Sequence, residues 1–200
     1  MKITVATGFD RSYSGLGEFT ARINMAYARK HGYDFVMYQR TWDRRPASWH
    51  KLLFARQQLP YCNWLLWLDA DACGVGKIDG FIKHNKFLVA GNGPGGTGLN
   101  MGIFLLRNCR LSHKFLKACY SQTQFVKHRL WETAAARRIV QGGEKNGFFR
   151  NMVISEYGKL WCTPRHATAD SCIVHAVGDQ SMAQKGHQLQ QTLKRINKPS

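Results

Sequence analysis

The chain has 200 residues, enough for one domain whose buried core needs no disulfide or metal staple. Its 29 Lys and Arg against 12 Asp and Glu give a formal charge of +17, so we expect anionic partners: a nucleotide diphosphate, an anionic acceptor, nucleic acid or an acidic membrane surface. A membrane-spanning helix is excluded because no apolar run approaches roughly 20 residues, and residues 1–6 lack a signal-peptide pattern, which predicts a soluble, cytoplasmic protein.

Neither the basic residues nor the cysteines form a local cluster. The Lys and Arg residues are spread along the chain instead of forming a tail, so a solvated basic face without a specific polyanionic partner stays an alternative. The six cysteines contain no C-x-x-C pair that would indicate zinc or a redox centre. We expect mostly buried free thiols.

Strand and helix patterns alternate through the first seventy residues. The run at 63–68 is apolar at nearly every position, which is typical of a central strand of a parallel sheet, covered on both faces. His31-Gly32 and Pro60 are stop signals for the two helices. This order is the pattern of half of a doubly wound α/β fold. The expected elements are strands at 2–6, 33–38 and 63–68, and helices at 18–30 and 49–59.

The second half of the chain is less regular. A glycine-rich stretch at 91–98 separates two expected strands, and the pattern is hard to interpret after Gly142-Gly143. A narrow apolar stripe indicates a terminal helix. The expected elements are strands at 87–90, 101–106 and 173–176, and helices at 111–125, at about 130–140 and around the stripe of Leu189, Leu193 and Ile196.

Asp69 and Asp71 directly follow the apolar strand. In an extended chain, residues two apart point to the same side with about 7 Å between their Cα atoms, so both carboxylates are expected to converge on one cation. The crevice at the carboxyl ends of strands is the ordinary ligand site of open α/β sheets. Two close carboxylates need a positive charge between them, and a divalent ion that also holds a nucleotide diphosphate supplies it. The alternative is two loop carboxylates paired with Arg or Lys.

An ordered series of motifs accompanies this pair. With them the chain resembles the galactosyl- and xylosyltransferase family of the GT-A class of glycosyltransferases, which also includes mannosyltransferases. A single D-x-D motif is weak evidence for a family. The series is stronger evidence, because it keeps the family's order and spacing over most of the chain. The matching segments are HGYD at 31–34, WHKL at 49–52, WLLWLDADA at 64–72, LNMGIFLLRNC at 99–109 and HAVG at 175–178.

The resemblance implies that Asp69, Asp71 and the late His175 hold Mn²⁺ or Mg²⁺ against the diphosphate of a sugar nucleotide. Such a metal neutralises the charge that builds on the departing diphosphate, and an imidazole ligand shifts the preference toward Mn²⁺. Gly178 would let the backbone turn close to the diphosphate, and Lys185 or the basic residues at 194–198 could close over it. The alternative for His175 is a strand-end histidine. We expect Asp71→Asn to remove transfer with little change in thermal stability, because the carboxylate would lie at the surface of a cleft.

The end of the first strand, Thr7-Gly8-Phe9, is expected beside the end of the third strand, where the family places the nucleotide. Gly8 permits close backbone approach, and Phe9 or Tyr13 is suited to stack on the base. A turn with two core aromatics is the alternative. Lys51, on the helix that enters the site, is expected to face the diphosphate, although a solvated helix face explains it almost as well.

The resemblance also assigns residues to the sugar. Asn100 lines the sugar pocket in the family, and Met101 replaces the family's usual small residue, which leaves the sugar identity open. Residues 130–135 resemble a segment in which the family carries an acidic residue followed by Gln. Glu132 occupies the acidic position, where it would bind donor or acceptor sugar hydroxyls, and Thr133 replaces the amide. A helix-surface glutamate is the alternative.

These observations predict one GT-A domain, a Rossmann-like α/β fold with a mixed, mainly parallel sheet flanked by helices. Its nucleotide-sugar half would span about 1–75 and its acceptor half about 76–200. The predicted activity is metal-dependent transfer of a hexose or pentose from a UDP- or GDP-sugar to a carbohydrate or glycoconjugate, with retention favoured by the resemblance.

The sequence supports two other classes of function less well. A HAD-like phosphotransferase also uses Asp-x-Asp after an apolar strand, with the first Asp as nucleophile. It normally carries the pair on its first strand, with Thr or Val where this chain has Cys73. The charge suggests a nucleic-acid-binding module, but no binding motif accompanies it, so we expect no nucleic-acid partner.

Overall fold

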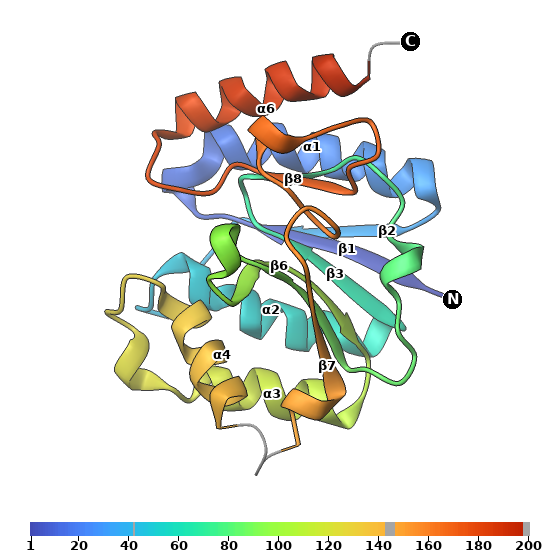
Figure 1. Ribbon diagram of the computed structural model, residues 1–200. Helices are drawn as coiled ribbons and strands as arrows, with labels where there is room; N and C mark the ends of the chain where they lie inside the picture. The colour runs from blue at the N-terminus through green and yellow to red at the C-terminus, as the bar shows by residue number, and fades with distance from the viewer. Residues whose placement is uncertain (42, 143–146, 198–200) are drawn as a thin grey trace.

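The computed structural model describes residues 1–41, 43–142 and 147–197 and contains a six-stranded sheet of order β2-β1-β3-β6-β5-β7 (Figure 1). Strand β6 runs antiparallel to both neighbours, whereas the β1–β2, β1–β3 and β5–β7 pairs are parallel. The predicted mixed, mainly parallel sheet is confirmed. The strands are β1 (Ile3–Gly8), β2 (Asp34–Tyr38), β3 (Trp64–Leu68), β5 (Leu88–Asn92), β6 (Leu99–Arg107) and β7 (Met152–Ser155).

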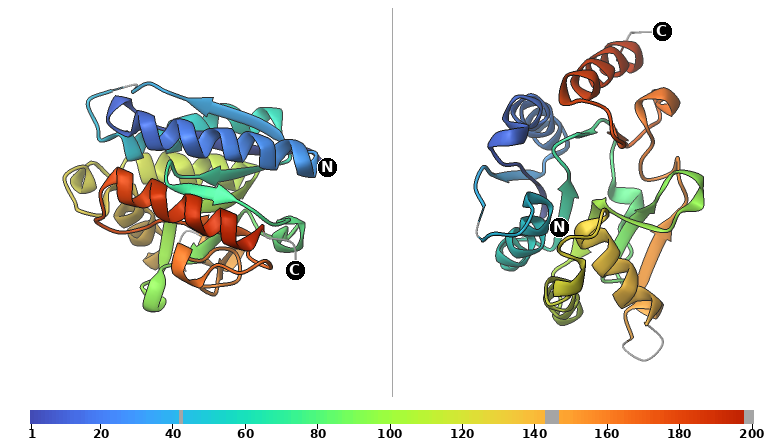
Figure 2. Two further views of the ribbon diagram at one scale, coloured as in Figure 1. Left: turned by 90° about the horizontal axis from the view of Figure 1, so that it is seen from above. Right: turned by 90° about the vertical axis from the view of Figure 1, so that its left-hand side faces the viewer.

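Helices cover both faces of this sheet. Figures 1 and 2 show α1 and α6 on one side, and α2, α3 and α4 on the other. Because side chains alternate along a strand, Leu66 and Leu68 of β3 pack in the same cluster as α1, and Leu65 and Trp67 pack with α2, α3 and α4. The helices are α1 (Ser14–His31), α2 (His50–Gln58), α3 (Arg110–Tyr120), α4 (Trp131–Gln141) and α6 (Met182–Ile196).

β3 lies in the middle of the sheet, and all five of its residues are buried. The expectation of parallel neighbours on both sides is wrong for one of them, because β6 pairs with β3 in the antiparallel direction. An apolar run reports burial of both faces of a strand. It carries no information on the direction of the neighbouring strand.

Element boundaries differ from the predictions where local signals are weak. α1 begins at Ser14 instead of 18, because a 3-10 turn at Arg11–Tyr13 leads directly into it. It ends as predicted, with Gly32 in the left-handed region at a φ of 70°. The helix expected at 111–125 ends at Tyr120, and a separate 3-10 turn follows at Thr123–Phe125, since Gln122 leaves helical angles.

A second, two-stranded sheet joins distant parts of the chain. β4 (Ala72–Gly74) pairs antiparallel with β8 (Ile173–His175), and Ala72 lies opposite His175. The sequence predicted β8, but it did not predict β4 or β7. Three residues are too few to show an alternation, and the residues before β7 have no regular pattern. This small sheet brings the carboxyl-terminal part of the chain beside Asp71.

A bulge in β6 shapes the edge of the large sheet near Asp69. Ala90 of β5 pairs with Phe104, but the next residue, Gly91, pairs with Asn100, so part of β6 is left out of the β5 ladder. In that part, Gly102 accepts a hydrogen bond through its carbonyl oxygen from the Asp69 N–H at 2.9 Å. This part of β6 therefore stays bonded to the chain just beyond β3 while it leaves the β5 ladder.

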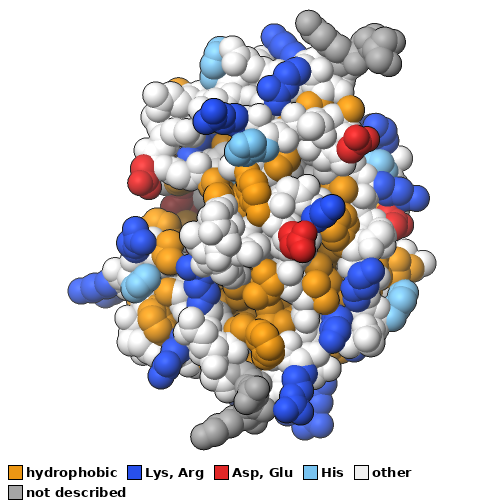
Figure 3. Space-filling model, in the orientation of Figure 1, with side chains coloured by type: hydrophobic (Ala, Val, Ile, Leu, Met, Phe, Trp, Pro, Cys, Tyr) orange, Lys and Arg blue, Asp and Glu red, His pale blue; other side chains and the backbone are white. Residues whose placement is uncertain are grey.

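Side chains outside this edge agree with two composition-based expectations. All six cysteines are free, and four of them are buried. In the view of Figure 3, Lys and Arg side chains are scattered with apolar side chains between them and form no single basic patch. Within the described residues, no helix combines the length and the apolar character needed to cross a membrane.

Candidate active site

Asp69 and Asp71 lie on a tight turn between β3 and β4. The Ala72 N–H donates to the Asp69 carbonyl oxygen at 2.9 Å and closes this turn. The carboxylates are therefore brought together by a turn, which corrects the extended conformation that the sequence suggested. The reason is topological: the chain leaves the six-stranded sheet after Leu68 and enters the smaller sheet at Ala72.

Two buried polar residues of α1 hold the turn from the side. The Thr20 hydroxyl donates to the Ala70 carbonyl oxygen at 2.8 Å. The Asn24 side-chain amide donates to the Ala72 carbonyl oxygen at 3.0 Å and accepts from the Gly74 N–H at 2.9 Å. Sequence reasoning missed both residues, although two polar side chains four apart on the buried face of a helix were the available signal.

The turn and β8 form a possible metal-binding cluster. Asp69, Asp71 and His175 each offer one ligand atom, and these atoms lie within 4.8 Å of one another. Gly102 leaves room for them, because a Cβ there would lie 2.5 Å from His175 Cε1 and 3.0 Å from Asp69 Oδ2. Two carboxylates and an imidazole are a donor set that suits Mn²⁺, so the residues fit the predicted metal.

Both carboxylate oxygens of Asp71 are occupied by protein groups. His175 Nε2 lies 2.9 Å from Asp71 Oδ1, and Lys185 Nζ lies 2.6 Å from Asp71 Oδ2. Burial would raise the pKa of Asp71, but His175 and Lys185 outweigh it and hold the pKa below its usual value. Asp71 is buried, which corrects the surface position expected from the sequence.

Asp69 belongs to a second ion-pair network. Its Oδ1 lies 2.6 Å from Lys51 Nζ and accepts a hydrogen bond from Trp67 Nε1 at 2.7 Å. Lys51 Nζ also lies 2.9 Å from Glu132 Oε1 and donates to the Met101 carbonyl oxygen at 3.3 Å. Lys51 thus joins α2 to the turn, to the first turn of α4 and to the β6 bulge.

The charges of this network shift one another's pKa values. Burial lowers the pKa of Lys51, but the carboxylates of Asp69 and Glu132 outweigh burial and raise it. Burial raises the pKa of Glu132, and the Lys51 ammonium acts against that rise. Lys51 is therefore held as a cation, and it stabilises the charged form of the carboxylates around it.

Two expectations for these residues are corrected. Lys51 is 2% exposed and is bound by carboxylates, which excludes the solvated helix face, and its role toward a diphosphate stays a prediction. Glu132 is 3% exposed, which excludes the helix-surface alternative. The Lys51 ammonium can be buried because the side chains of Asp69 and Glu132 surround it.

The end of β1 is the predicted nucleotide side of the site. Thr7 is fully buried, and its hydroxyl has no partner among the described residues. Gly8 lies against a ring, because a Cβ there would be 2.1 Å from Tyr38 Cε1. Phe9 is 3% exposed and packs on Gly17 of α1, so it is unable to stack on a base. Tyr13, in contrast, is exposed and stays a candidate.

Asn100 lies beside Gly102, which faces the cluster, and Gly178 lies three residues after His175 in the chain. Asn100 Oδ1 accepts from the Gly102 N–H at 2.7 Å, so this side chain stabilises the bulge that carries Gly102. Gly178 is exposed, has a φ of 111° and follows β8 in the link to α6. The position of Gly178 after His175 follows from the chain alone, and its role toward a diphosphate stays a prediction.

Two tryptophans near these residues were not predicted. Trp161 packs against the His175 ring with 5.3 Å between ring centroids, and Gly91 makes room for its indole. Trp131, directly before Glu132, has a φ of 39° and is 44% exposed. It is the one non-glycine residue with positive φ in the described parts of the chain. The strained backbone of Trp131 and the contact of Trp161 with the distant His175 have no local pattern from which they could be predicted.

The structure is similar to solved glycosyltransferases over nearly its whole length. A glycosyltransferase involved in the glycosylation of the major capsid of PBCV-1 matches with a TM-score of 0.77 and 17% identity, over 96% of this chain and 100% of that one. The galactosyltransferase LgtC, in complex with donor and acceptor sugar analogs, matches with a TM-score of 0.64 and 9% identity, over 98% and 97% of the two chains. The fold is therefore that of the GT-A glycosyltransferases, not of a phosphotransferase.

The sequence comparisons point to one family within this class. Residues 17–76 match the sequence model of the galactosyl transferase GMA12/MNN10 family. Galactomannan galactosyltransferase 1 of Cyamopsis tetragonoloba is 28% identical over 120 residues, which cover 52% of this chain and 28% of the plant enzyme. The resemblance predicted from the motifs is confirmed. The chain spans little more than a quarter of that relative.

Proposed function

We propose that this protein is a metal-dependent glycosyltransferase that moves a sugar from a UDP- or GDP-sugar to a carbohydrate or glycoconjugate. One observation carries the proposal. Asp69 and Asp71 are more than 100 residues from His175 in the sequence, yet the three offer ligand atoms within 4.8 Å of one another at the carboxyl end of β3 in a GT-A fold. Open α/β sheets place their ligands at this position.

Asp69, Asp71 and His175 would hold Mn²⁺ or Mg²⁺, with Mn²⁺ favoured by the imidazole. When bound, the ion would neutralise the negative charge of the leaving diphosphate. Thr20 and Asn24 hold the turn that carries both carboxylates, so the ligand geometry is fixed by the core of the protein. A preorganised ligand set loses little free energy to reorganisation during transfer.

The sugar of the donor would lie beside Asn100 and Glu132. Glu132 enters the site from α4 and is paired with Lys51, and its carboxyl oxygens suit hydrogen bonds with sugar hydroxyls. Lys51 also pairs with Asp69, so it holds the carboxyl groups of Asp69 and Glu132 at a fixed distance from each other. We assign Lys51 a positioning role, because it reaches the substrate only through these two residues.

The acceptor class and the stereochemistry are proposed from relatives. The names of the plant and viral relatives point to polysaccharide and glycoprotein acceptors, and one neighbour was solved with donor and acceptor sugar analogs. Retention at the anomeric carbon follows the resemblance to the galactosyl- and xylosyltransferases. We place the nucleotide along the end of β1, with the exposed Tyr13 ring as the candidate to stack on the base.

The test is donor hydrolysis followed by nuclear magnetic resonance. A panel of UDP- and GDP-sugars is incubated with Mn²⁺, and the released anomer is identified before it equilibrates. We expect one donor to be cleaved with release of the retained anomer, and cleavage to stop with EDTA. Asp71→Asn should reduce cleavage by roughly 10²- to 10³-fold. Asp170→Asn, which changes an exposed carboxylate, should not affect it. Cleavage that persists in EDTA and in Asp71→Asn would contradict the proposal.

A further inference from the structure

We propose that Lys185 is a resident cation of the metal site, which a divalent ion must displace from Asp71, so that the ion binds tightly only together with a nucleoside diphosphate. This inference rests on the proposed function, because it assumes that Asp71 is a metal ligand. It concerns a residue that the metal cluster itself does not include.

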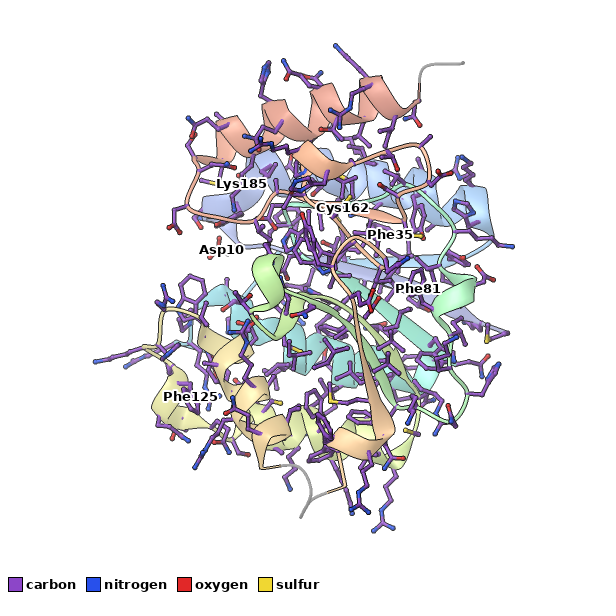
Figure 4. The ribbon with its side chains drawn as sticks, viewed as in Figure 1. Asp10, Phe35, Phe81, Phe125, Cys162 and Lys185 are labelled. Atoms are coloured by element: carbon purple, nitrogen blue, oxygen red, sulfur yellow. The ribbon has the colours of Figure 1, made fainter. Side chains whose placement is uncertain are left out.

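Lys185 reaches Asp71 from a different layer of the molecule. It lies in the first half of α6, on the side of the helix that faces the sheet, and it is 6% exposed (Figure 4). Its Nζ is 2.6 Å from Asp71 Oδ2, while the other oxygen of Asp71 faces His175 Nε2. A metal on this carboxylate would therefore compete with an ammonium group at contact distance.

A count of the charges shows why the competition matters. At the cluster, the carboxylates of Asp69 and Asp71 already face two ammonium groups, of Lys51 and Lys185. A divalent ion added to these paired charges would leave the site with an excess of positive charge. Excess charge in a poorly hydrated site is unfavourable. A diphosphate brings at least two negative charges and restores the balance, so ion and diphosphate should bind together.

The chain between His175 and Lys185 permits the exchange. Residues 178–184 are exposed, and Gly178 has a φ that side chains rarely adopt. Further along α6, Leu189 is completely buried in a cluster with Leu16 of α1, so the helix stays anchored when its first turn shifts. The ammonium of Lys185 is then free to face the incoming anion, while α6 keeps its place.

Calorimetry of Mn²⁺ binding tests the inference on three proteins: wild type, Lys185→Met and Lys194→Met. Lys194 is an exposed residue of the same helix, so its variant controls for the loss of one positive charge. We expect Lys185→Met to bind Mn²⁺ alone at least tenfold more tightly than wild type, and Lys194→Met to stay within twofold. Saturating UDP or GDP should strongly increase the Mn²⁺ affinity of the wild type. The factor of this increase should be at least fivefold smaller in Lys185→Met.

Unchanged or weaker Mn²⁺ binding by a folded Lys185→Met would overturn the inference and leave the proposed metal site intact. Absence of Mn²⁺ binding by all three proteins, with and without UDP or GDP, would instead overturn the proposed metal site itself.

A second measurement needs no variant at Lys185. Amine acylation of wild type, read residue by residue by mass spectrometry, reports whether the Lys185 Nζ is held by Asp71. We expect its acylation to rise when Mn²⁺ is added alone, with that of Lys194 unchanged. Equal acylation of Lys185 at saturating Mn²⁺ and without it would overturn the displacement.

Discussion

The two carboxylates of the turn are two residues apart, but they are held by opposite layers of the molecule. Asp69 is bound by Trp67 and by Lys51 of α2, on the side of the sheet that α2, α3 and α4 cover. Asp71 is bound by His175 of β8 and by Lys185 of α6, on the other side. The D-x-D segment therefore joins the two layers of the molecule. Each aspartate connects the candidate metal site to a different part of the core.

The largest effect is expected from Asp71→Asn. Loss of a charged ligand raises the barrier by several kcal/mol, so donor cleavage should fall by roughly 10²- to 10³-fold. The variant also leaves the buried Lys185 without its carboxylate, so its melting temperature should fall as well, contrary to the expectation from sequence. Wild-type activity together with a wild-type melting temperature would contradict both roles of Asp71.

On the Asp69 side, Lys51→Met should mainly reduce stability. It leaves Asp69 and Glu132 facing each other without the buried cation, at a cost of about 3–5 kcal/mol. The melting temperature should fall on the order of 10 °C. The double variant Lys51→Met with Glu132→Gln should recover part of this loss in a urea titration. No recovery would mean that the two side chains act independently.

The Asp71 pair also predicts a pH dependence. The pKa of Asp71 is lower in the folded chain than in the unfolded chain, because His175 and Lys185 outweigh burial. The stabilising contribution is therefore complete above about pH 4, the ordinary range of a carboxyl group, and it is lost as the pH falls further. Urea unfolding between pH 2 and 7 should show a smaller acid-induced loss in Asp71→Asn than in wild type. Parallel curves would exclude this contribution.

The turn between the two carboxylates provides a milder perturbation. Asn24→Ala leaves the Ala72 carbonyl oxygen without its donor and the Gly74 N–H without its acceptor. The free energy of unfolding should fall by about 1–3 kcal/mol. Because the turn sets the spacing of Asp69 and Asp71, Mn²⁺ affinity should fall together with stability. Thr168→Ala changes an exposed hydroxyl-bearing residue and is the control. An unaltered Mn²⁺ affinity in Asn24→Ala would show that the turn keeps its shape without this support.

The smallest effect concerns the dispersed basic surface. If the charge of +17 only attracts an anionic donor, added salt should slow its association by a few-fold and leave the maximal turnover unchanged. Stopped-flow binding of a fluorescent UDP analogue at several salt concentrations measures this directly. Submicromolar binding of duplex or single-stranded nucleic acid at physiological salt, without binding of any nucleotide sugar, would reverse the functional assignment.

Periodicity and local stop signals predicted much of the fold. The apolar run of β3 and the His31-Gly32 stop of α1 were recognisable because their causes lie within a few residues. The three-residue β4 and the direction of β6 could not be recognised in the sequence, since both depend on pairing with distant segments. The motif series predicted the metal cluster of Asp69, Asp71 and His175, which the structure brings together.

The partners of these residues were harder to predict. Lys185 lies 114 residues from Asp71 in the sequence, and the sequence suggested that it closes over the diphosphate, not that it pairs with this carboxylate. The Lys51–Glu132 pair joins α2 to α4 in the same way. Phe9 was misassigned, because the sequence does not show that Gly17 of α1 leaves room for its ring. Buried charge pairs are set by three-dimensional packing, which has no local sequence pattern.

Pulsed electron paramagnetic resonance of bound Mn²⁺ reports directly whether a histidine nitrogen is a metal ligand. We expect Mn²⁺ bound with UDP or GDP to show coupling to a histidine nitrogen in the wild type. This coupling should disappear in His175→Ala and persist in His187→Ala, a change of an exposed histidine on α6. A spectrum without nitrogen coupling in the wild type, or one that His175→Ala leaves unchanged, would contradict the claim that His175 completes a metal site with Asp69 and Asp71.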